Sequence, residues 1–265
     1  MLSDAPIGIF DSGIGGLSVL KHIRALLPHE DLKYVSDRAH LPYGNKDNDF
    51  ILQRSRYITQ FLVEQNVKAI VIACNTATAA AVKYLRENFP IPIIGMEPGV
   101  KPAIEQSQSG MIGVLATQGT LSSHKFQTLL QQHANGSNIV ICPCQGWVEA
   151  IELNGHDHQI THKLVAQGLQ PILESGVDTL VLGCTHYPFL RKAIENIAGS
   201  EISIIDTGEA VAKQLYRRLV DLDLLSQTTS PGTEDYWCSA PPQETQTMIE
   251  RLLCKPVFVQ SLPKI

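Results

Sequence analysis

The chain has 265 residues, of which 44% are hydrophobic, and its 21 basic and 26 acidic residues give a net charge of −5. This length allows a substantial core in one large or two medium domains, and the scattered basic residues argue against nucleic-acid binding. No apolar run approaches the ~20 residues of a membrane-spanning helix, and the first residues lack a secretory pattern. Composition therefore predicts a soluble, cytoplasmic protein without a membrane partner, whose six cysteines are free thiols.

The first half of the chain alternates between predicted strands and predicted helices. Strands are predicted at 7–10, 32–36, 69–73 and 91–94, and helices at 17–27, 49–66 and 75–87. A glycine-rich turn, Asp11–Gly16, follows the first strand, and a polar loop with Pro42, Tyr43 and Gly44 follows the second. Because a run such as Ala69–Ala73 is apolar without interruption, it suits a strand of a parallel sheet with both faces covered by helices.

The same alternation restarts at residue 111. Strands are predicted at 111–116, at 138–142, at the run ending in Cys184 and at 202–205, with helices at 119–133, 146–153, 159–175 and 188–198. The tail adds helices at 209–222 and 242–253 and strands near 236–237 and at 257–259. The pattern predicts an α/β fold of two doubly wound parallel-sheet halves that bind ligands outside the carboxyl ends of their strands.

Two stretches of the chain look like copies of one another. Leu62–Cys74 and Ile172–Cys184 align without a gap at an offset of 184 − 74 = 110 residues. Each contains a helix end, a tight connection, an apolar strand and a cysteine where a helix is predicted to begin. A helix N-terminus lowers the pKa of a thiol and favours the thiolate. Each half of the chain is therefore expected to present one reactive cysteine at a ligand-binding strand end.

The turn Asp11–Gly16 has two interpretations. Its glycines could let backbone N–H groups close on an anion at a helix start. A dinucleotide site is disfavoured because the third glycine of that motif is missing and the turn opens with an acid. The alternative is a simple glycine turn in which Asp11 caps the following helix.

The remaining cysteines and a group of histidines give weaker signals. Cys142-Pro143-Cys144 could indicate redox or metal chemistry, but one such motif without a second pair is weak. Cys238 and Cys254 are predicted to be packing residues. The histidines at 156, 158 and 162 flank a turn signal, so we expect a solvated helix start rather than a metal site.

Five motifs spread over nearly the whole chain carry a family resemblance. They are Ile7–Gly16, Asp37 with Pro42–Gly44, Cys74–Ala77, Val148–Glu152 and Gly183–Pro188. Together they resemble the glutamate racemases of the cofactor-independent aspartate/glutamate racemase superfamily. His186 favours the glutamate enzymes, since the aspartate enzymes tend to have an acid there. The alternatives are a relative that racemises aspartate or hydantoins, and a catalytically silent amino-acid sensor of the same fold.

The resemblance implies a particular architecture and role. It implies two flavodoxin-like domains related by a pseudo-two-fold axis, with the substrate site in the cleft between them. The first domain would comprise residues 1–97 and 207–265, and the second residues 98–206. It also implies a homodimer, no metal, nicotinamide or pyridoxal cofactor, and a bacterial host that uses D-glutamate for peptidoglycan.

The resemblance also implies the site residues. The catalytic group would be Cys74, Cys184, Asp11, His186 and Glu152. The substrate would be bound by Asp11, Ser12, Pro42, Tyr43, Gly44, Asn75, Thr76, Thr117, Thr120, Thr185 and His186. Glu149 is an alternative to Glu152, because the segment before this motif is longer than usual. Inversion of an α-carbon needs a base on one face and an acid on the other, which two thiols can supply.

Overall fold

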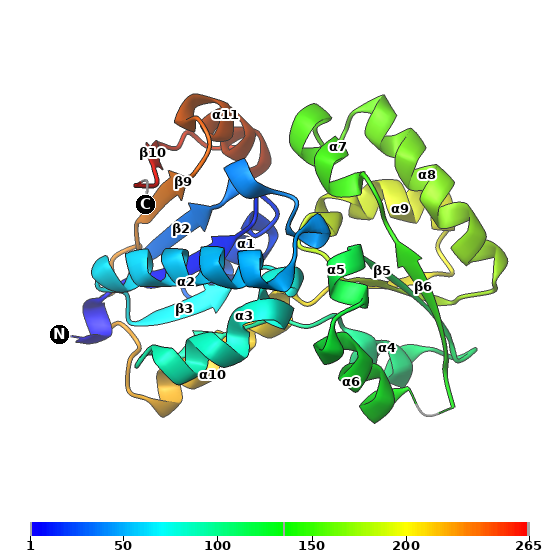
Figure 1. Cartoon of the computed structure of the whole chain (residues 1–265), viewed down its shortest axis with the longest axis horizontal. Coiled ribbons are helices and arrows are strands. Elements are labelled where there is room, and N and C mark those ends of the chain that lie inside the picture. Colours follow the sequence, from blue (N-terminus) through cyan, green and yellow to red (C-terminus); the bar gives the residue numbers. More distant parts are fainter. Residues whose placement is uncertain (1, 135, 264–265) are drawn as a thin grey trace. The chain divides into compact units, whose positions relative to one another are not determined.

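The computed structural model describes residues 2–134 and 136–263, and the chain divides into two compact units. Unit 1 comprises Met1–Met96 and Gly208–Ile265, and unit 2 comprises Glu97–Thr207. Each unit holds one sheet, and every strand pair in both sheets is parallel, so the predicted α/β class is confirmed (Figure 1). None of the helices in the described ranges is long and apolar enough to span a membrane.

The sheet of unit 1 has six strands in the order β10-β9-β2-β1-β3-β4. They are β1 (Ile7–Asp11), β2 (Leu32–Ser36), β3 (Ala69–Ile72), β4 (Ile93–Ile94), β9 (Glu234–Cys238) and β10 (Val259–Ser261). At the centre, Ile9 lies opposite Tyr34 on one side and Val71 on the other, and all three are fully buried. The uninterrupted apolar runs of the sequence thus form strands that are covered on both faces.

Five α-helices cover the sheet of unit 1. They are α1 (Leu17–Leu26), α2 (Asn48–Glu64), α3 (Asn75–Asn88), α10 (Gly208–Asp221) and α11 (Pro242–Leu253), and the short 3₁₀ turns are η1 (Leu2–Asp4), η2 (Arg38–His40) and η3 (Tyr43–Asn45). Helix α2 begins where the Asp47 carboxylate accepts a hydrogen bond from the Phe50 N–H at 2.7 Å. It buries Ile51, Ile58 and Leu62, a spacing that keeps them on one helical face.

Unit 2 repeats the core of this topology. Its strands β5 (Met111–Ala116), β6 (Asn138–Pro143), β7 (Thr179–Leu182) and β8 (Ser203–Ile205) have the order β6-β5-β7-β8, which matches β2-β1-β3-β4. Its helices are α4 (Val100–Gln106), α5 (Gln118–Leu121), α6 (His124–His133), α7 (Trp147–Asn154), α8 (Gln159–Glu174) and α9 (Arg191–Ala198), with the 3₁₀ turn η4 (Tyr187–Leu190). The two halves of the chain therefore have equivalent third strands, β3 and β7.

Three predicted elements differ from the observed ones, and one observed helix was not predicted. The helix expected at 119–133 is split into α5 and α6 because Ser123 caps a new helix, accepting from the Phe126 N–H at 3.1 Å. The helix expected at 188–198 begins as the 3₁₀ turn η4. The last strand lies at 259–261 rather than 257–259, and helix α4 was not predicted.

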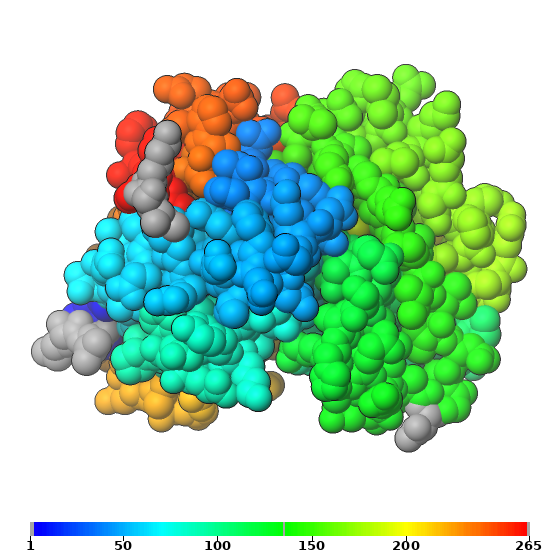
Figure 2. Space-filling view, in the orientation of Figure 1, coloured from blue at the N-terminus to red at the C-terminus, as the bar shows by residue number. Residues whose placement is uncertain are grey.

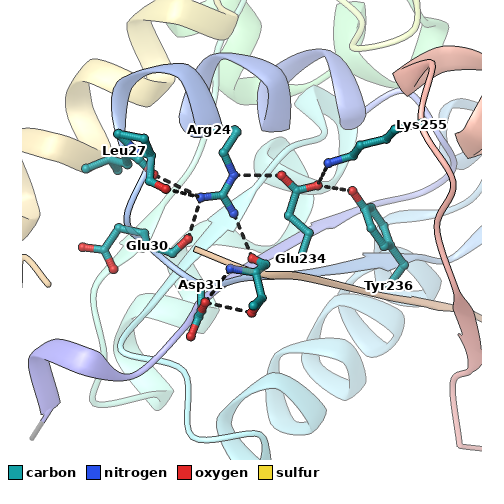
Figure 3. A network of polar contacts seen from close by, with 9 residues as sticks. Arg24, Leu27, Glu30, Asp31, Glu234, Tyr236 and Lys255 are labelled. Carbon is teal, nitrogen blue, oxygen red and sulfur yellow. Dashed lines mark hydrogen bonds and ion pairs between the residues drawn. The ribbon is translucent and has the colours of Figure 1, made fainter. Parts of the chain in front are cut away.

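The C-terminal segment of unit 1 is fastened to α1 by a polar network (Figure 3). The Glu234 carboxylate on β9 accepts from Arg24 at 2.8 Å, from Lys255 at 2.6 Å and from the Tyr236 hydroxyl. Burial alone would raise the pKa of Glu234, but these three donors hold it below its usual value. Arg24 also donates to the carbonyl oxygen of Glu30 at 2.8 Å. The space-filling view shows this orange C-terminal segment packed beside blue N-terminal residues (Figure 2).

Candidate active site

In unit 1, Cys74 lies just beyond the carboxyl end of β3 and is the N-cap of α3. Its sulfur accepts a hydrogen bond from the Ala77 N–H at 3.4 Å, and the residue is 5% exposed. The helix start predicted at this cysteine is therefore confirmed. An N–H group and the positive end of the helix dipole both favour a negative charge on this sulfur.

The Asp11 turn lies beside this thiol at the end of β1. The fully buried Asp11 carboxylate accepts the Gly16 N–H at 2.8 Å and the Ser12 hydroxyl at 3.5 Å. The Ser12 hydroxyl oxygen lies 3.9 Å from the Cys74 sulfur. A Cβ at Gly16 would come within 2.8 Å of the Asp11 Cβ and 2.9 Å of the Tyr34 hydroxyl. The glycine is thus needed for the turn to close on its own aspartate.

The loop with Pro42, Tyr43 and Gly44 is held by Asp37, which follows β2. The Tyr43 hydroxyl donates to Asp37 at 2.6 Å, and Arg54 from α2 donates to both carboxylate oxygens at 2.8 and 2.9 Å. Burial alone would raise the pKa of Asp37, but the bonds from Arg54 and Tyr43 hold it below its usual value. Arg54 was missed by the sequence analysis, since one arginine on an amphipathic helix looks like a surface residue.

Asn75 and Thr76 form the first turn of α3 and are both buried. Neither the oxygen nor the nitrogen of the Asn75 side-chain amide has a hydrogen-bond partner among the described residues. Buried polar atoms are nearly always paired in native proteins. An amide that offers one acceptor and two donors without protein partners is suited to a polar ligand.

In unit 2, three buried side chains form a continuous polar chain. The Cys184 sulfur, beyond the end of β7, lies 3.8 Å from His186 Nδ1, and His186 Nε2 lies 2.8 Å from the Glu152 carboxylate on α7. These residues are 8%, 1% and 3% exposed, respectively. Glu149 lies one turn earlier on α7 and is only half-buried. Of the two glutamates that the sequence left open, Glu152 is the one that contacts His186.

The charge of His186 follows from these contacts. Burial alone would lower its pKa, but the hydrogen bonds with Cys184 and Glu152, and their negative charges, raise the pKa well above its usual value. A protonated imidazole therefore faces the Cys184 sulfur, and the Glu152 carboxylate balances its charge. An imidazolium in this position can stabilise a thiolate and can exchange a proton with it.

The surroundings of Cys184 differ from those of Cys74 in one respect. The residues after Cys184 form the 3₁₀ turn η4, with the Tyr187 N–H donating to the Cys184 carbonyl at 3.1 Å. The α-helix start predicted at this cysteine is therefore wrong. A short 3₁₀ turn has too few aligned peptide dipoles to act as a helix end, and His186 provides the positive charge instead.

Three more of the threonines predicted to bind substrate lie in unit 2, after its strands β5 and β7. Thr185 is buried beside Cys184. Thr117 follows β5 and caps α5, accepting from the Thr120 N–H at 3.3 Å, while its hydroxyl lies 3.1 Å from the Thr120 hydroxyl. Thr117 follows β5 as Ser12 follows β1, which is the equivalent strand of unit 1.

His40 joins the Asp37 group, with its Nδ1 3.0 Å from the carboxylate, whereas several other histidines and cysteines have separate surroundings. His158 caps α8, accepting from the Ile160 N–H at 3.2 Å, which agrees with the predicted helix start. Nowhere in residues 2–134 and 136–263 do three histidine, cysteine or acidic side chains gather as a metal site. Cys238 is buried as predicted. Cys254 is exposed at the end of α11, so its predicted packing role is wrong.

Comparisons with known proteins find similar sequences and similar folds. The family model described as Asp/Glu/hydantoin racemase matches residues 15–215. A glutamate racemase of Methylococcus capsulatus is 51% identical over 91% of this chain and 89% of its own. Among solved structures, a glutamate racemase isoform of Bacillus anthracis has a TM-score of 0.90 and 30% identity, with 98% of both chains covered. The Escherichia coli glutamate racemase, solved with L-glutamate and the activator UDP-MurNAc-ala, has a TM-score of 0.86 and 30% identity, with 98% of this chain and 99% of its own covered.

Proposed function

Because the chain belongs to the Asp/Glu/hydantoin racemase family and is an amino-acid racemase that acts on glutamate, we propose that Cys74 and Cys184 are its two bases. The observation that carries the proposal is the equivalence of the two thiols. Each follows the third strand of a sheet with the same core strand order, and each sulfur lies beside a polar side chain, Ser12 or His186. One thiolate removes the α-proton of glutamate, and the other thiol protonates the opposite face of the α-carbon.

The environment of each thiol suits one side of this reaction. The N-terminus of α3 favours a negative charge on Cys74, and the Cys74 thiol donates to the Ser12 hydroxyl, which in turn donates to Asp11. At the other thiol, His186 can hold or return the proton of Cys184, and Glu152 fixes the imidazole from its far side. Asp11 and His186 therefore assist proton transfer, and Glu152 is a positioning residue.

Substrate binding is assigned to the polar groups around the two thiols. The Asn75 amide supports this assignment, because its buried oxygen and nitrogen have no partner within the described ranges. An amide of this kind can donate to a glutamate carboxylate. We assign further contacts to the remaining residues that the family resemblance implies, namely Asp11, Ser12, Pro42, Tyr43, Gly44, Thr76, Thr117, Thr120, Thr185 and His186.

A biological role and an assembly complete the proposal. We propose that the D-glutamate serves peptidoglycan synthesis in the cytoplasm and that the enzyme is a homodimer. The Escherichia coli relative was crystallised with an activator that contains muramic acid, a peptidoglycan sugar, which supports the link to the cell wall. The mass of the purified protein in sedimentation would test the homodimer.

The two-base proposal is tested by proton exchange in D₂O. Protiated L-glutamate should give D-glutamate with deuterium at the α-carbon, because the second thiol delivers a hydrogen that has exchanged with solvent. The remaining L-glutamate should stay protiated early in the reaction. Early deuterium in recovered substrate, at the level found in product, would contradict two separate bases and favour a single base.

Cysteine variants test the same assignment in a second way. Cys74→Ala and Cys184→Ala should each abolish racemisation in both directions, since every turnover uses both groups. Cys238→Ala is the matched control, because this thiol donates to the Ala240 carbonyl at 2.9 Å and has no place in the reaction. Circular dichroism of L-glutamate over time measures all three, and racemisation that survives in either catalytic variant would exclude that cysteine.

A further inference from the structure

Unit 2 contains a pair of thiols that the proposed reaction does not use. Cys142 is the fifth residue of the six-residue strand β6, and Cys144 follows directly after that strand. Residues two apart in an extended chain point to the same face, and here the two sulfurs lie 3.8 Å apart. Strand β6 is an edge strand of its sheet, so one side of this segment is not covered by another strand.

The two thiols need little movement to bond. A disulfide has an S–S distance of about 2.05 Å, so the observed separation must close by less than ~2 Å. The Cys142 thiol donates to the Gly168 carbonyl oxygen at 3.6 Å, and its sulfur accepts from Cys144. Pro143 stands between the cysteines, and its ring fixes φ, which limits the conformational entropy lost on closure. Geometry therefore favours a bond within this motif.

The pair also differs from the other four cysteines, because it combines a thiol that is partly exposed to solvent with a second thiol close enough to bond to it. Cys142 is partly exposed, whereas Cys74 and Cys184 are 5% and 8% exposed. Cys254 is exposed, but its sulfur is paired only with the Arg251 carbonyl at 3.7 Å. Cys144 is 6% exposed and is reached most directly through Cys142.

The two thiols have opposite tendencies to ionise. The hydrogen bond from Cys144 lowers the pKa of Cys142, and this effect outweighs partial burial. Burial raises the pKa of Cys144 well above its usual value, and the neighbouring Cys142 raises it further. A thiolate is the form that attacks an oxidant, so Cys142 reacts first, and Cys144 gives its proton to the leaving hydroxide as its sulfur attacks the product.

We propose that Cys142 and Cys144 form an oxidation site, at which a hydroperoxide converts the two thiols into an intramolecular disulfide. The Cys142 thiolate attacks one peroxide oxygen and becomes a sulfenic acid, and for hydrogen peroxide the leaving hydroxide takes a proton to give water. The Cys144 sulfur then attacks the Cys142 sulfur, the S–O bond breaks, and a second water leaves. Two thiols are oxidised, one peroxide is reduced, and a dithiol reductant reverses the reaction.

The experiment counts thiols and maps the bond in the full-length protein. After brief exposure to hydrogen peroxide, the number of alkylatable thiols should fall from six to 6 − 2 = 4 and should return to six with dithiothreitol. Tryptic residues 126–163 contain both cysteines and no internal lysine or arginine, and Cys184 lies in residues 164–191. The disulfide should therefore appear as peptide 126–163, lighter by two hydrogens and resistant to alkylation.

Serine variants assign the two roles. Cys142→Ser should retain the remaining five thiols under the same treatment (6 − 1 = 5). Cys144→Ser should stop at a Cys142 sulfenic acid, which dimedone traps on peptide 126–163. Cys254→Ser is the matched control, because it removes an exposed thiol without a sulfur partner, and its peptide 126–163 should oxidise as in the wild type.

Three results would overturn the proposal. The first is a link between peptides 126–163 and 164–191, which would mean that Cys144 pairs with the nearby Cys184. The second is a link between two copies of the chain. The third is oxidation confined to Cys254 or to the catalytic thiols while peptide 126–163 remains fully alkylatable.

Discussion

The charge on His186 depends on two neighbours that lie on opposite sides of its ring. The Cys184 sulfur is 3.8 Å from Nδ1, and the Glu152 carboxylate is 2.8 Å from Nε2. An imidazolium buried without partners would lose its proton, because desolvation disfavours the charged form. The protonation of this ring therefore rests on both Cys184 and Glu152, and Glu152 is the neighbour that can be altered without removing a proposed base.

Glu152→Gln should lower the pKa of His186, because the side chain keeps its shape and loses its charge. In the wild type the raised pKa keeps the ring charged at neutral pH. In the variant the ring loses its proton at a lower pH, so the limb of the kcat/KM profile that reports His186 moves toward acid. Histidine NMR titration and pH–rate profiles measure the two effects separately.

Glu149→Gln provides the control for this experiment, since Glu149 is half-buried in the first turn of the same helix and has no part in the contact with His186. Its profile should overlay that of the wild type. A Glu152→Gln protein in which His186 titrates at the wild-type pH would show that the carboxylate does not control the charge of the ring.

Single residues were predictable where the sequence repeats itself. Cys74 and Cys184 could be found because two stretches of the chain align without a gap. The choice between Glu149 and Glu152 stayed open, because residues three apart lie near the same helical face and only packing decides which one reaches His186. Arg54 carries no local signal, since its partner Asp37 lies 17 positions earlier.

Asp37 connects three elements of unit 1. It follows β2, binds the Tyr43 hydroxyl of η3, and forms a bidentate pair with Arg54 of α2. The carboxylate is fully buried, and the Arg54 side chain is 14% exposed. Removal of one partner from such a pair leaves the other charge buried without compensation.

Asp37→Asn should lower the free energy of unfolding by about 3 kcal/mol at pH 7, the usual cost of breaking a buried ion pair. The folded-state pKa of Asp37 is depressed. The contribution of the Asp37 carboxylate to the free energy of unfolding is therefore fully present above its unfolded-state pKa of about 4. This contribution is lost as the pH falls through the lower pKa of the folded state. Urea denaturation at pH 7 and at acid pH measures the difference in the free energy of unfolding between the wild type and the variant. This difference should be smaller at acid pH.

Asp235→Asn is the matched control, because the Asp235 side chain is 48% exposed in its pair with Lys33 at 3.4 Å. Exposed pairs contribute about 1 kcal/mol or less. If the two variants lose the same free energy of unfolding, the Asp37 network contributes no more to stability than a surface ion pair does.

Helices and strands were predictable where the local hydrophobic pattern agrees with the tertiary packing. They were not predictable where the two differ. The apolar run Val257-Phe258-Val259 suggested a strand, but pairing with β9 begins only at Val259, and Phe258 is 75% exposed. The split between α5 and α6 depends on the single cap at Ser123 within an otherwise helical pattern. The register of a strand and the cap of a helix are decided by single contacts with specific partner residues. A hydrophobic pattern taken over many residues does not show such single contacts.

At the scale of the molecule, the two sheets share four strands in the same order, and unit 1 adds β9 and β10 beyond β2. In unit 2 the equivalent strand, β6, is an edge. The sequence predicted the alternation of strands and helices in both halves. It gave no local signal that β9 would pair with β2, whose residues lie about 200 positions earlier, since such pairing depends on the whole fold.

A chain that ends at Gly232 should be poorly soluble, because it lacks β9, β10 and the Glu234 carboxylate that binds Arg24. The open edge of β2 would then expose unpaired backbone groups beside buried apolar residues. The soluble fraction on expression and the profile in size-exclusion chromatography measure the effect. Phe258→Ser, which alters an exposed side chain of the same segment, is the control and should behave as the wild type. A soluble, monodisperse truncated chain would show that β9 is not needed to protect the edge of β2.

The split composition of unit 1 has a consequence for the newborn chain on the ribosome. Unit 2 is continuous, so all of its residues emerge before Gly208. The β2 strand ends at Ser36, whereas β9 begins at Glu234, which is 234 − 36 = 198 residues later. At roughly 5–20 residues per second, synthesis leaves the edge of β2 without its partner for about 10–40 s. Chaperones that cover unpaired strands are therefore required most by the half of the protein that is made first.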